Sequence, residues 1–578
     1  MGAIRGDWFR VLRNGRVART GRALLAALLW FAASAVACAQ GVGPIPQSEQ
    51  LGRERQRFTE PPPTLAEPAG PRLALPSTVA PEGAEKIRLK IRAIRIDGVT
   101  VYRPEDLAVL YQDMIGREVA LTAVYDLAQR ITAKYGTDGY VLSRAIVPPQ
   151  NLSKGGATIH IQVIEGYVDK VVWPTGLERF RDYFSYYAAK IMADRPANVR
   201  TMERYLLLAG ELPGLKFSTS LKASEKNPNA ATLFVEVVYK PVEGVARIDN
   251  RGTPARGPLQ YLSSLTANNL FGMHDAFTFS YASVVPTKEL TYLAGSYRQV
   301  LTAEGLTAFV NASDGYGKPG TSQLELLKFK TKTLYGDAGF SFPFIRSREE
   351  NLIFSGLMFA SDSTSDVLGV RFNNDRIRGT RFRTDFDMAD AWRGINQVNL
   401  VTSQGIDGLG STTNNNPLAS RLPGRVDFTK FEATVSRTQP LFAPISAYLS
   451  GYSQYATTSL LSPEQCSFGG RFFGRAFDPS QLLGDTCLMG NAELRYDVPT
   501  FWSLTQIQLY GFTDGAELFN RVPGAGFPNW THAASTGGGV RLGWLTNISA
   551  DLTVAKKIDG PHGPHDDTRF FFAVTGKY

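Results

Sequence analysis

Few residues in this sequence have the types and spacing that catalysis or metal binding requires. The strongest metal candidate is Pro-His-Gly-Pro-His-Asp-Asp at residues 561–567. Its two histidines lie in a Pro-Gly hairpin just before the last predicted strand, which favours a solvated turn over a metal site. The sequence contains no Gly-x-Ser-x-Gly motif, no Walker loop and no zinc-finger cysteine pattern. We therefore predict a protein that is not an enzyme and that binds no metal and no cofactor.

The first 39 residues are typical of a secretory signal peptide. Six arginines precede an apolar run at residues 23–37, and an Ala-x-Ala site predicts cleavage before Gln40. Lipidation of Cys38 is the alternative, although Ala35 is a poor fit three positions before it. The leader carries +5 of the net charge of +9, which leaves +4 on the rest of the chain. So weak an excess does not indicate nucleic-acid binding.

Residues 40–242 divide into a tail and two similar units. The polar stretch at about 44–58 predicts a short helix, and six prolines at 60–76 predict an extended linker; a disordered tail is the alternative. Apolar spacing then predicts the order strand, helix, helix, strand, strand over residues 89–166 and again over 167–242. This is an internal repeat of an α+β unit.

Helical periodicity stops at residue 243. The remaining residues divide into alternating segments, such as 275–284, 290–300 and 505–514, separated by turn residues. We count sixteen, although fourteen or eighteen fit the length too. Strands of about 9–11 residues joined by alternately short and long connections are typical of outer-membrane barrels. A closed sheet pairs every backbone group in lipid without leaving an edge.

The C-terminal segment is the most specific local signal for a barrel. In the sequence of residues 569–578, Phe570, Phe572 and Tyr578 fall on one face, and the chain stops on an aromatic residue. This resembles the terminal signature of bacterial outer-membrane barrels, which their assembly machinery reads. A soluble all-β sandwich is the alternative. We predict a sixteen-stranded antiparallel transmembrane β-barrel over residues 243–578.

Two α+β units followed by a barrel resemble the outer-membrane transporters of two-partner secretion, of the haemolysin-activator type within the BamA-type superfamily. The resemblance rests on residues 135–168, with their Gly-Tyr strand, Pro-Gln turn and Glu-Gly end, on Leu-Pro-Gly at 212–214, and on Asn-x-Gly at 250–252. It implies two POTRA domains, at 89–166 and 167–242, and a plug helix at about 44–58.

Residues 461–485 resemble the family's loop between strands 11 and 12. That loop folds into the barrel and carries Val-Arg-Gly-aromatic at its tip. Arg475 matches the arginine and Phe477, followed by Asp478, matches the aromatic residue. Gly474 stands where valine is usual and Ala476 where glycine is usual. If the glycine position needs a positive φ, Ala476 is strained and Gly474 takes the turn instead.

Residues 511–518 resemble the superfamily's Phe-x-Asp-x-Gly element on strand 13. Phe512 and Asp514 match, but the glycine is at 515 instead of 516. The resemblance implies that Asp514 on the barrel wall binds Arg475 of the loop through a charge-assisted pair. The alternative places Arg475 in a solvated loop and Asp514 in an ordinary turn.

Cys466 and Cys487 flank the same loop, with the second cysteine 21 residues after the first. A disulfide between them would stabilise the loop by roughly 3 kcal/mol in the loop-entropy model. Free buried thiols are the alternative. The compartment implied by the leader permits a disulfide.

The resemblance implies a transporter that binds a haemolysin- or adhesin-type exoprotein through periplasmic POTRA domains and secretes it through a porin-like barrel in the outer membrane. Its other expected partners are outer-membrane lipid and the barrel-assembly machinery. The alternative function is assembly of other outer-membrane proteins, but such factors usually carry more POTRA domains. Passive porins have none.

Overall fold

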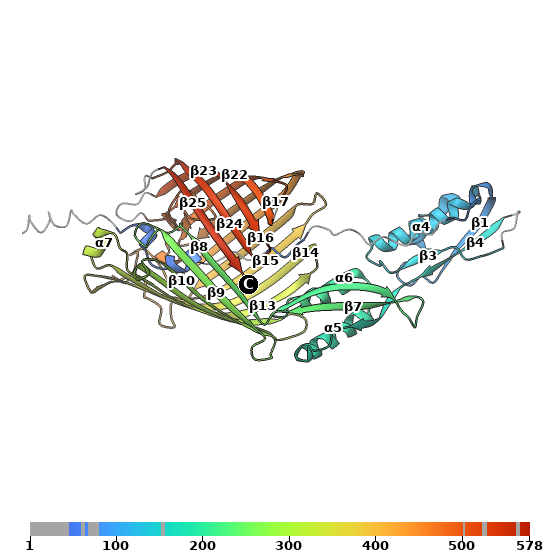
Figure 1. Cartoon of the computed structure of the whole chain (residues 1–578), viewed down its shortest axis with the longest axis horizontal. Helices are drawn as coiled ribbons and strands as arrows, with labels where there is room; N and C mark the ends of the chain where they lie inside the picture. The colour runs from blue at the N-terminus through green and yellow to red at the C-terminus, as the bar shows by residue number, and fades with distance from the viewer. Residues whose placement is uncertain are drawn as a thin grey trace, which may run out of the picture.

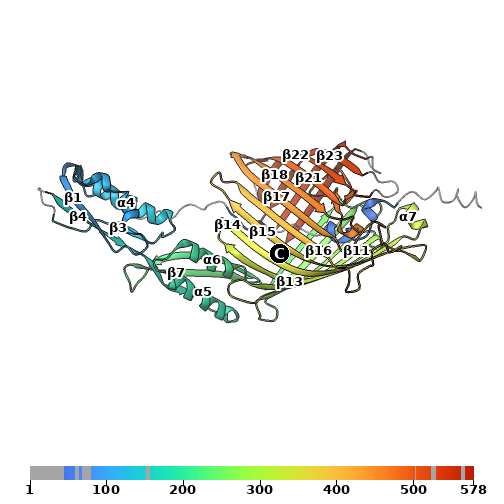
Figure 2. The ribbon, with the colours of Figure 1, turned by 180° about the vertical axis from the view of Figure 1, so that it is seen from behind.

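The computed structural model describes residues 45–58, 64–67, 80–151, 156–500, 503–522, 529–561 and 567–578. The predicted leader, its cleavage site and the histidines of the 561–567 hairpin lie outside these residues. Two small α+β units stand in a row at one end of a β-barrel (Figures 1 and 2). Within the described residues, no helix has the length and apolarity needed to cross a membrane.

The first unit packs two helices on a four-stranded sheet of order β2-β1-β4-β3. Leu121–Thr137 (α4) buries Val124, Leu127, Ile131 and Tyr135, whose spacing is that of one face of a helix. The sequence-based prediction missed the strand β2, three residues that pair antiparallel with β1 directly before α4. The elements are β1 (Arg88–Asp97), α3 (Pro104–Ala108), β2 (Glu118–Ala120), α4, β3 (Arg144–Ile146) and β4 (Ala157–Ile164).

The second unit has the predicted order of strand, two helices and two strands. Its sheet order is β5-β7-β6, with β5 and β7 parallel, as β1 and β4 are in the first unit. Its helices bury an aromatic core that includes Phe180, Phe184 and Tyr187. The elements are β5 (Tyr167–Val172), α5 (Arg181–Ala193), α6 (Val199–Gly210), β6 (Leu215–Ala223) and β7 (Ala230–Tyr239).

The described residues after β7 contain sixteen strands that close into an antiparallel barrel, as the sequence predicted. In chain order they are β8 (Val242–Asp249), β9 (Leu259–Asn268), β10 (Asp275–Val285), β11 (Leu290–Val300), β12 (Thr307–Gly317), β13 (Lys330–Arg346), β14 (Glu350–Val367), β15 (Val370–Ala389), β16 (Ile395–Gly405), β17 (Thr429–Phe442), β18 (Ile445–Ala456), β21 (Thr486–Asp497), β22 (Leu504–Phe519), β23 (Trp530–Trp544), β24 (Ile548–Asp559) and β25 (Thr568–Lys577).

The first and last strands form the seam of the barrel. β25 pairs with β8 from Ala573 opposite Asp249 to Lys577 opposite Val245. Beyond that ladder, the Asn250 side chain accepts a hydrogen bond from the Phe572 amide (2.8 Å) and donates one to the Phe570 carbonyl (3.0 Å). The Asn-x-Gly segment therefore extends the closure past the end of β8.

Side chains alternate between the lumen and the outer face along each strand. On β22, Tyr510, Phe512 and Asp514 are buried, whereas Leu509 before them and Thr513 between them are exposed. Phe570 of β25 is 58% exposed, as expected for a residue on the lipid-facing side. Buried charged residues therefore gather inside the barrel, where the functional site lies.

The second unit is docked on the turns at one end of the barrel. Glu304, in the turn between β11 and β12, accepts hydrogen bonds from the hydroxyls of Tyr186 (2.7 Å) and Tyr205 (3.0 Å). His274, in the turn between β9 and β10, packs its ring 4.0 Å from that of Tyr183. These contacts come from both α5 and α6, so they fix the unit to the barrel at two turns.

Candidate functional site

The segment between β18 and β21, residues 457–485, is here called the inward loop. It carries two short strands, β19 (Cys466–Phe468) and β20 (Leu482–Gly484), which pair antiparallel. A disulfide joins Cys466 to Cys487 with their Cα atoms 6.6 Å apart, within the range that bridged cysteines adopt. The loop is thus tied to strand β21 at its base.

The tip of the inward loop is a tight turn that only glycine fits. Gly474 has φ +74°, and its carbonyl accepts a hydrogen bond from the Phe477 amide (2.8 Å). A Cβ atom on Gly474 would lie 2.6 Å from the ring of Phe468. Ala476 is not among the residues with positive φ. In this chain the residue with positive φ is therefore Gly474 and not the residue at position 476, so Ala476 is not strained.

Arg475 projects from this turn onto the wall carboxylate that the resemblance implied. Its Nε and Nη2 donate to Asp514 Oδ2 and Oδ1 at 3.2 and 2.9 Å, and its backbone amide donates to Oδ2 at 2.9 Å. Both side chains are buried. Asn491 and Ser535 donate further hydrogen bonds to the same carboxylate. A buried carboxylate that accepts hydrogen bonds from several groups is fixed in place, and it holds the guanidinium in one orientation.

A second carboxylate, Glu493 on β21, was missed by the sequence analysis. It accepts a hydrogen bond from Arg475 Nη1 (2.9 Å) and is held in turn by Arg541 (2.7 Å) and Arg495 (2.7 Å). Glu493 lies two residues from Asn491, which is paired opposite Asp514 in the barrel register. Strand alternation alone would have placed Glu493 on the same face, and this was the available signal.

Aromatic rings complete the surroundings of Arg475. Its guanidinium carbon lies 3.5 Å from the centre of the Phe512 ring, a cation–π contact in a buried setting. The rings of Phe477 and Phe468 pack 5.3 Å apart. Asp478 forms an ion pair with Arg569 of β25 (2.8 Å), so the tip of the loop also contacts the seam strand.

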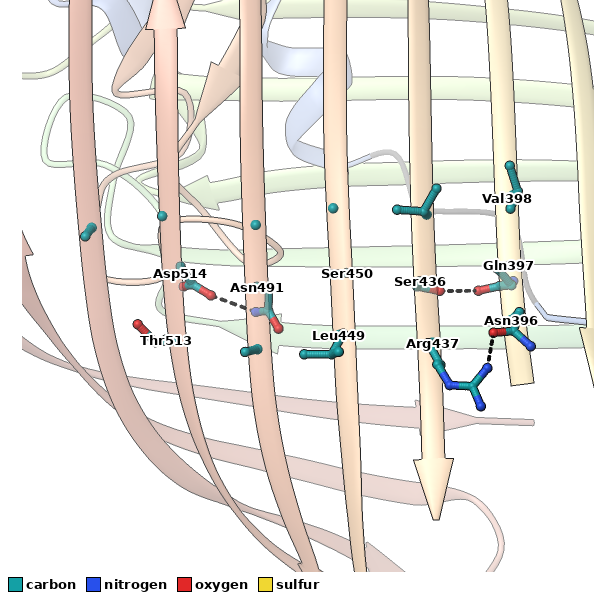
Figure 3. Close-up of a pocket in the computed structure, with 16 residues that line it drawn as sticks. Asn396, Gln397, Val398, Ser436, Arg437, Leu449, Ser450, Asn491, Thr513 and Asp514 are labelled. Carbon is teal, nitrogen blue, oxygen red and sulfur yellow. Dashed lines mark hydrogen bonds between the residues drawn. The ribbon is translucent and has the colours of Figure 1, made fainter. Parts of the chain in front are cut away.

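Asp514 and Asn491 line a pocket bounded by strands β16 to β18 and β21 to β23 (Figure 3). The dashed line between them is their 2.7 Å hydrogen bond. In contrast, the terminal aromatics Phe570 and Tyr578 are exposed, whereas Arg475 and Asp514 are buried.

The N-terminal segment, residues 45–58, lies inside the barrel at the end remote from the α+β units, as both ribbon views show (Figures 1 and 2). It contains a 3-10 turn, Gln47–Glu49, and the helix α2 (Arg53–Phe58). Glu49 and Glu54 are buried and form ion pairs with Arg256, from the connection between β8 and β9. The Thr331 hydroxyl on β13 donates to Glu54 at 2.8 Å. Charged groups therefore hold the segment to the wall.

The chemistry of this site is electrostatic. In the described ranges no group of three or more His, Cys, Asp or Glu side chains could hold a metal ion. The arrangement can hold a loop and an N-terminal segment inside a barrel through buried, hydrogen-bonded ion pairs. Removing one partner of such a pair is strongly destabilising, because it leaves the other charge buried and unpaired.

Comparison with known proteins identifies the family. Residues 234–542 match the haemolysin secretion/activation protein family ShlB/FhaC/HecB, and residues 89–166 match the ShlB-type POTRA domain. The first match covers more than half of the chain. This protein belongs to the ShlB/FhaC/HecB family.

Similar proteins extend the match along the chain. The outer membrane transporter CdiB of Dickeya dadantii is 23% identical over 501 residues, covering 83% of this chain and 84% of that protein. The heme/hemopexin transporter protein HuxB of Haemophilus influenzae is 24% identical over 172 residues, 30% of each chain. The solved structure of CdiB from Escherichia coli has a TM-score of 0.67 at 18% identity and covers 88% of this chain and 94% of that one, which shows a shared fold.

Family, barrel and POTRA domain together give the location. The chain is an outer-membrane transporter of the two-partner secretion type, with its barrel in the outer membrane and its POTRA domain in the periplasm. The predictions of family and localisation are confirmed.

Proposed function

We propose that this transporter binds an exoprotein of the haemolysin or adhesin type in the periplasm and secretes it through the barrel lumen. One observation carries the proposal. A closed barrel with α+β units at its periplasmic end holds an inward loop whose Arg475 is bound by the buried carboxylates of Asp514 and Glu493. A loop held this way supports a regulated path for a protein better than it supports a passive pore.

Residues 167–242 act in this proposal as a second POTRA domain. The unit has two helices and a mixed sheet whose parallel pair, β5 and β7, corresponds to β1 and β4 of the POTRA domain at 89–166. The N-terminal segment acts as a plug that occupies the lumen until substrate arrives. Its buried ion pairs with Arg256 support this role.

Arg475 has the role of holding the barrel in a transport-competent conformation. Replacing it leaves Asp514 and Glu493 buried without their shared guanidinium, so Arg475→Ala should stop secretion of the partner, which is expected in the neighbouring reading frame. Arg475→Lys keeps the charge but loses the bidentate geometry and should secrete less than a tenth of the wild-type amount, since such a loss is worth at least about 1.4 kcal/mol.

The control for this experiment is Arg471→Ala, four residues earlier in the same loop and partly exposed. It should secrete normally. Heat modifiability in the outer membrane must be retained by all three variants, which separates transport from barrel folding. Normal secretion by Arg475→Ala in a correctly folded barrel would reject the role of Arg475.

Strand β6 is the part of the periplasmic units best suited to bind an extended substrate. Within the described residues it pairs on one side only, with β7, along its nine residues from Leu215 to Ala223. The edge strands of the first sheet, β2 and β3, are three residues each. A long, exposed edge can accept a further strand through backbone hydrogen bonds. We therefore place substrate capture at β6.

A photo-crosslinking amino acid at Thr219, in the exposed middle of β6, should trap the exoprotein during secretion. The same amino acid at Ser185, exposed on α5, should not, because a helix face offers no unpaired backbone groups. The measurement is the yield of crosslinked product on gels. Equal yields at the two positions would contradict edge binding.

A further inference from the structure

The root of the inward loop carries a second buried ion cluster, distinct from that of Arg475. The turn at residues 462–465, here called the root turn, presents Glu464 to a different part of the wall, strands β15 and β17. Arg381 of β15 donates to both of its carboxylate oxygens, at 2.7 and 2.8 Å. Lys430 of β17 lies 2.8 Å from Oε2. The exposed fractions of these side chains are 4% for Glu464, 12% for Arg381 and 5% for Lys430.

The backbone of the root turn is held as well. The Glu464 carbonyl accepts hydrogen bonds from Lys430 Nζ (3.3 Å) and from Gln454 Nε2 on β18 (3.2 Å). The inward loop is therefore fixed at two places with opposite polarity. At the tip, an arginine of the loop meets acids of β21 and β22. At the root, a glutamate of the loop meets bases of β15 and β17.

The N-terminal segment rests on the same root turn. Arg53 is buried and donates to the carbonyls of Ser462 and Gln465, the residues on either side of Glu464 in the turn. The Ser462 hydroxyl donates to Gln50 at 2.8 Å. These carbonyls face Arg53 only while the turn keeps its position, and the Glu464 carboxylate, paired with Arg381 and Lys430, is the charged group among those that hold the turn.

We propose that Glu464 is a positioning residue that anchors the root of the inward loop and thereby seats the N-terminal segment in the lumen. The inference rests on the proposed function in one respect, that the segment must leave the lumen for transport. Removing the Glu464 charge frees the root turn, withdraws the carbonyls that bind Arg53, and opens the pore. Arg475 stays in place at the tip of the loop, because its partners Asp514 and Glu493 lie on β22 and β21, whereas the ionic partners of Glu464 lie on β15 and β17.

The experiment measures where the N-terminal segment lies in the full-length protein in the outer membrane. A cysteine replaces the buried Ser48, and its reaction rate with a charged, water-soluble maleimide is followed in intact cells. Glu464→Gln should raise that rate about tenfold, the effect expected for losing a buried charge-assisted hydrogen bond. Glu464→Asp, which keeps the carboxylate, should restore most of the protection. Purified Glu464→Gln protein should also conduct ions in planar bilayers for a correspondingly larger fraction of the time.

The matched control is Glu325→Gln. Glu325 also faces a lysine, Lys288 at 3.8 Å, but both side chains are at least half exposed in the loops beyond the barrel. It should leave labelling and conductance unchanged. If Glu464→Gln fails to fold, Lys430→Gln replaces it, since it removes one cation and leaves the pair with Arg381.

The proposal is overturned if Glu464→Gln, or Lys430→Gln in its place, labels and conducts like Glu325→Gln, or if Glu464→Asp behaves as Glu464→Gln does. Failure of the proposed function is a separate result, because it is read from the secretion of Arg475→Ala and not from labelling of the N-terminal segment.

Discussion

Arg475 shows how a single side chain in this lumen depends on groups from several strands. Asp514 on β22 and Glu493 on β21 share its guanidinium, and Arg541 on β23 holds Glu493. Hydrogen bonds between charged groups contribute more than neutral ones, but a buried charge that loses its partner is costly. The loop tip is therefore held more firmly than one ion pair would allow.

Gly474→Val, which restores the residue usual in the family, should destabilise the loop tip of this chain. A β-branched residue at φ +74° costs about 1–3 kcal/mol, and its Cβ would overlap the Phe468 ring. We expect lower secretion and a lower temperature for the heat-modifiability transition. Ala476→Gly, two residues on, has no such clash and should change both by little. A Gly474→Val protein that matches wild type in both measurements would contradict the assigned turn.

At the level of elements, the inward loop is held by its base, its root turn and its tip. The base is the Cys466–Cys487 disulfide beside the β19–β20 hairpin. The root turn is held through Glu464, and the tip through Arg475. Holding a loop of nearly thirty residues at separated points limits the conformations open to it and keeps its tip on the wall.

The disulfide can be tested without any assay of transport. Alkylation of the denatured protein without reductant should leave Cys466 and Cys487 unmodified, and both should react after reduction. Replacing both with serine should lower the stability of the loop by about 3 kcal/mol. The rate of limited proteolysis within residues 457–485 of the folded barrel measures this loss of stability. Labelling of both cysteines before reduction would reject the bridge.

On the scale of the whole molecule, the second α+β unit and the barrel are joined through Glu304. Burial by itself would raise the pKa of this carboxyl, but hydrogen bonds from Tyr186, Tyr205 and Arg204 outweigh it, so the pKa lies below its usual value of about 4.5. Because the pKa of Glu304 is lowered in the folded protein, its contribution to the docking free energy is fully present at pH values above about 4.5. It is lost as the pH falls through the lowered pKa.

Glu304→Ala should therefore loosen the second unit at neutral pH. Because the side chain is one-third exposed, solvent screening limits the loss to about 1 kcal/mol. Spin labels at the exposed positions Lys222 and Asn547 should show a broader distance distribution than in the wild type. Acidification below the lowered pKa should broaden the wild-type distribution in the same way. Glu225→Ala, exposed in the β6–β7 turn, should have no effect at neutral pH, and equal widths for the two variants would contradict the docking role.

Sequence periodicity was sufficient to predict the long helices and the barrel strands, because the forces that produce it are local. Alternation of apolar residues follows from having lipid on one face of a strand and the lumen on the other, so β11 was predicted at its observed bounds. In the first unit, the first of the two predicted helices, α3, is short and ends at Ala108. A 3-10 turn at Gln112–Met114 comes after the helix, and β2 follows it.

The sequence by itself determined that the chain forms a barrel and, through the resemblance, predicted the pairing of Arg475 with Asp514. It favoured sixteen strands, but the closed sheet of the structure was needed to exclude fourteen or eighteen. Only the tertiary structure decided which other charges meet in the lumen. Arg53 binds the carbonyl of Ser462, 409 residues away, and Glu464 meets Arg381 from another strand. Such contacts depend on the register of sixteen strands and on the path of a loop through the lumen. No local pattern encodes either, since any inward-facing charge satisfies the same alternation.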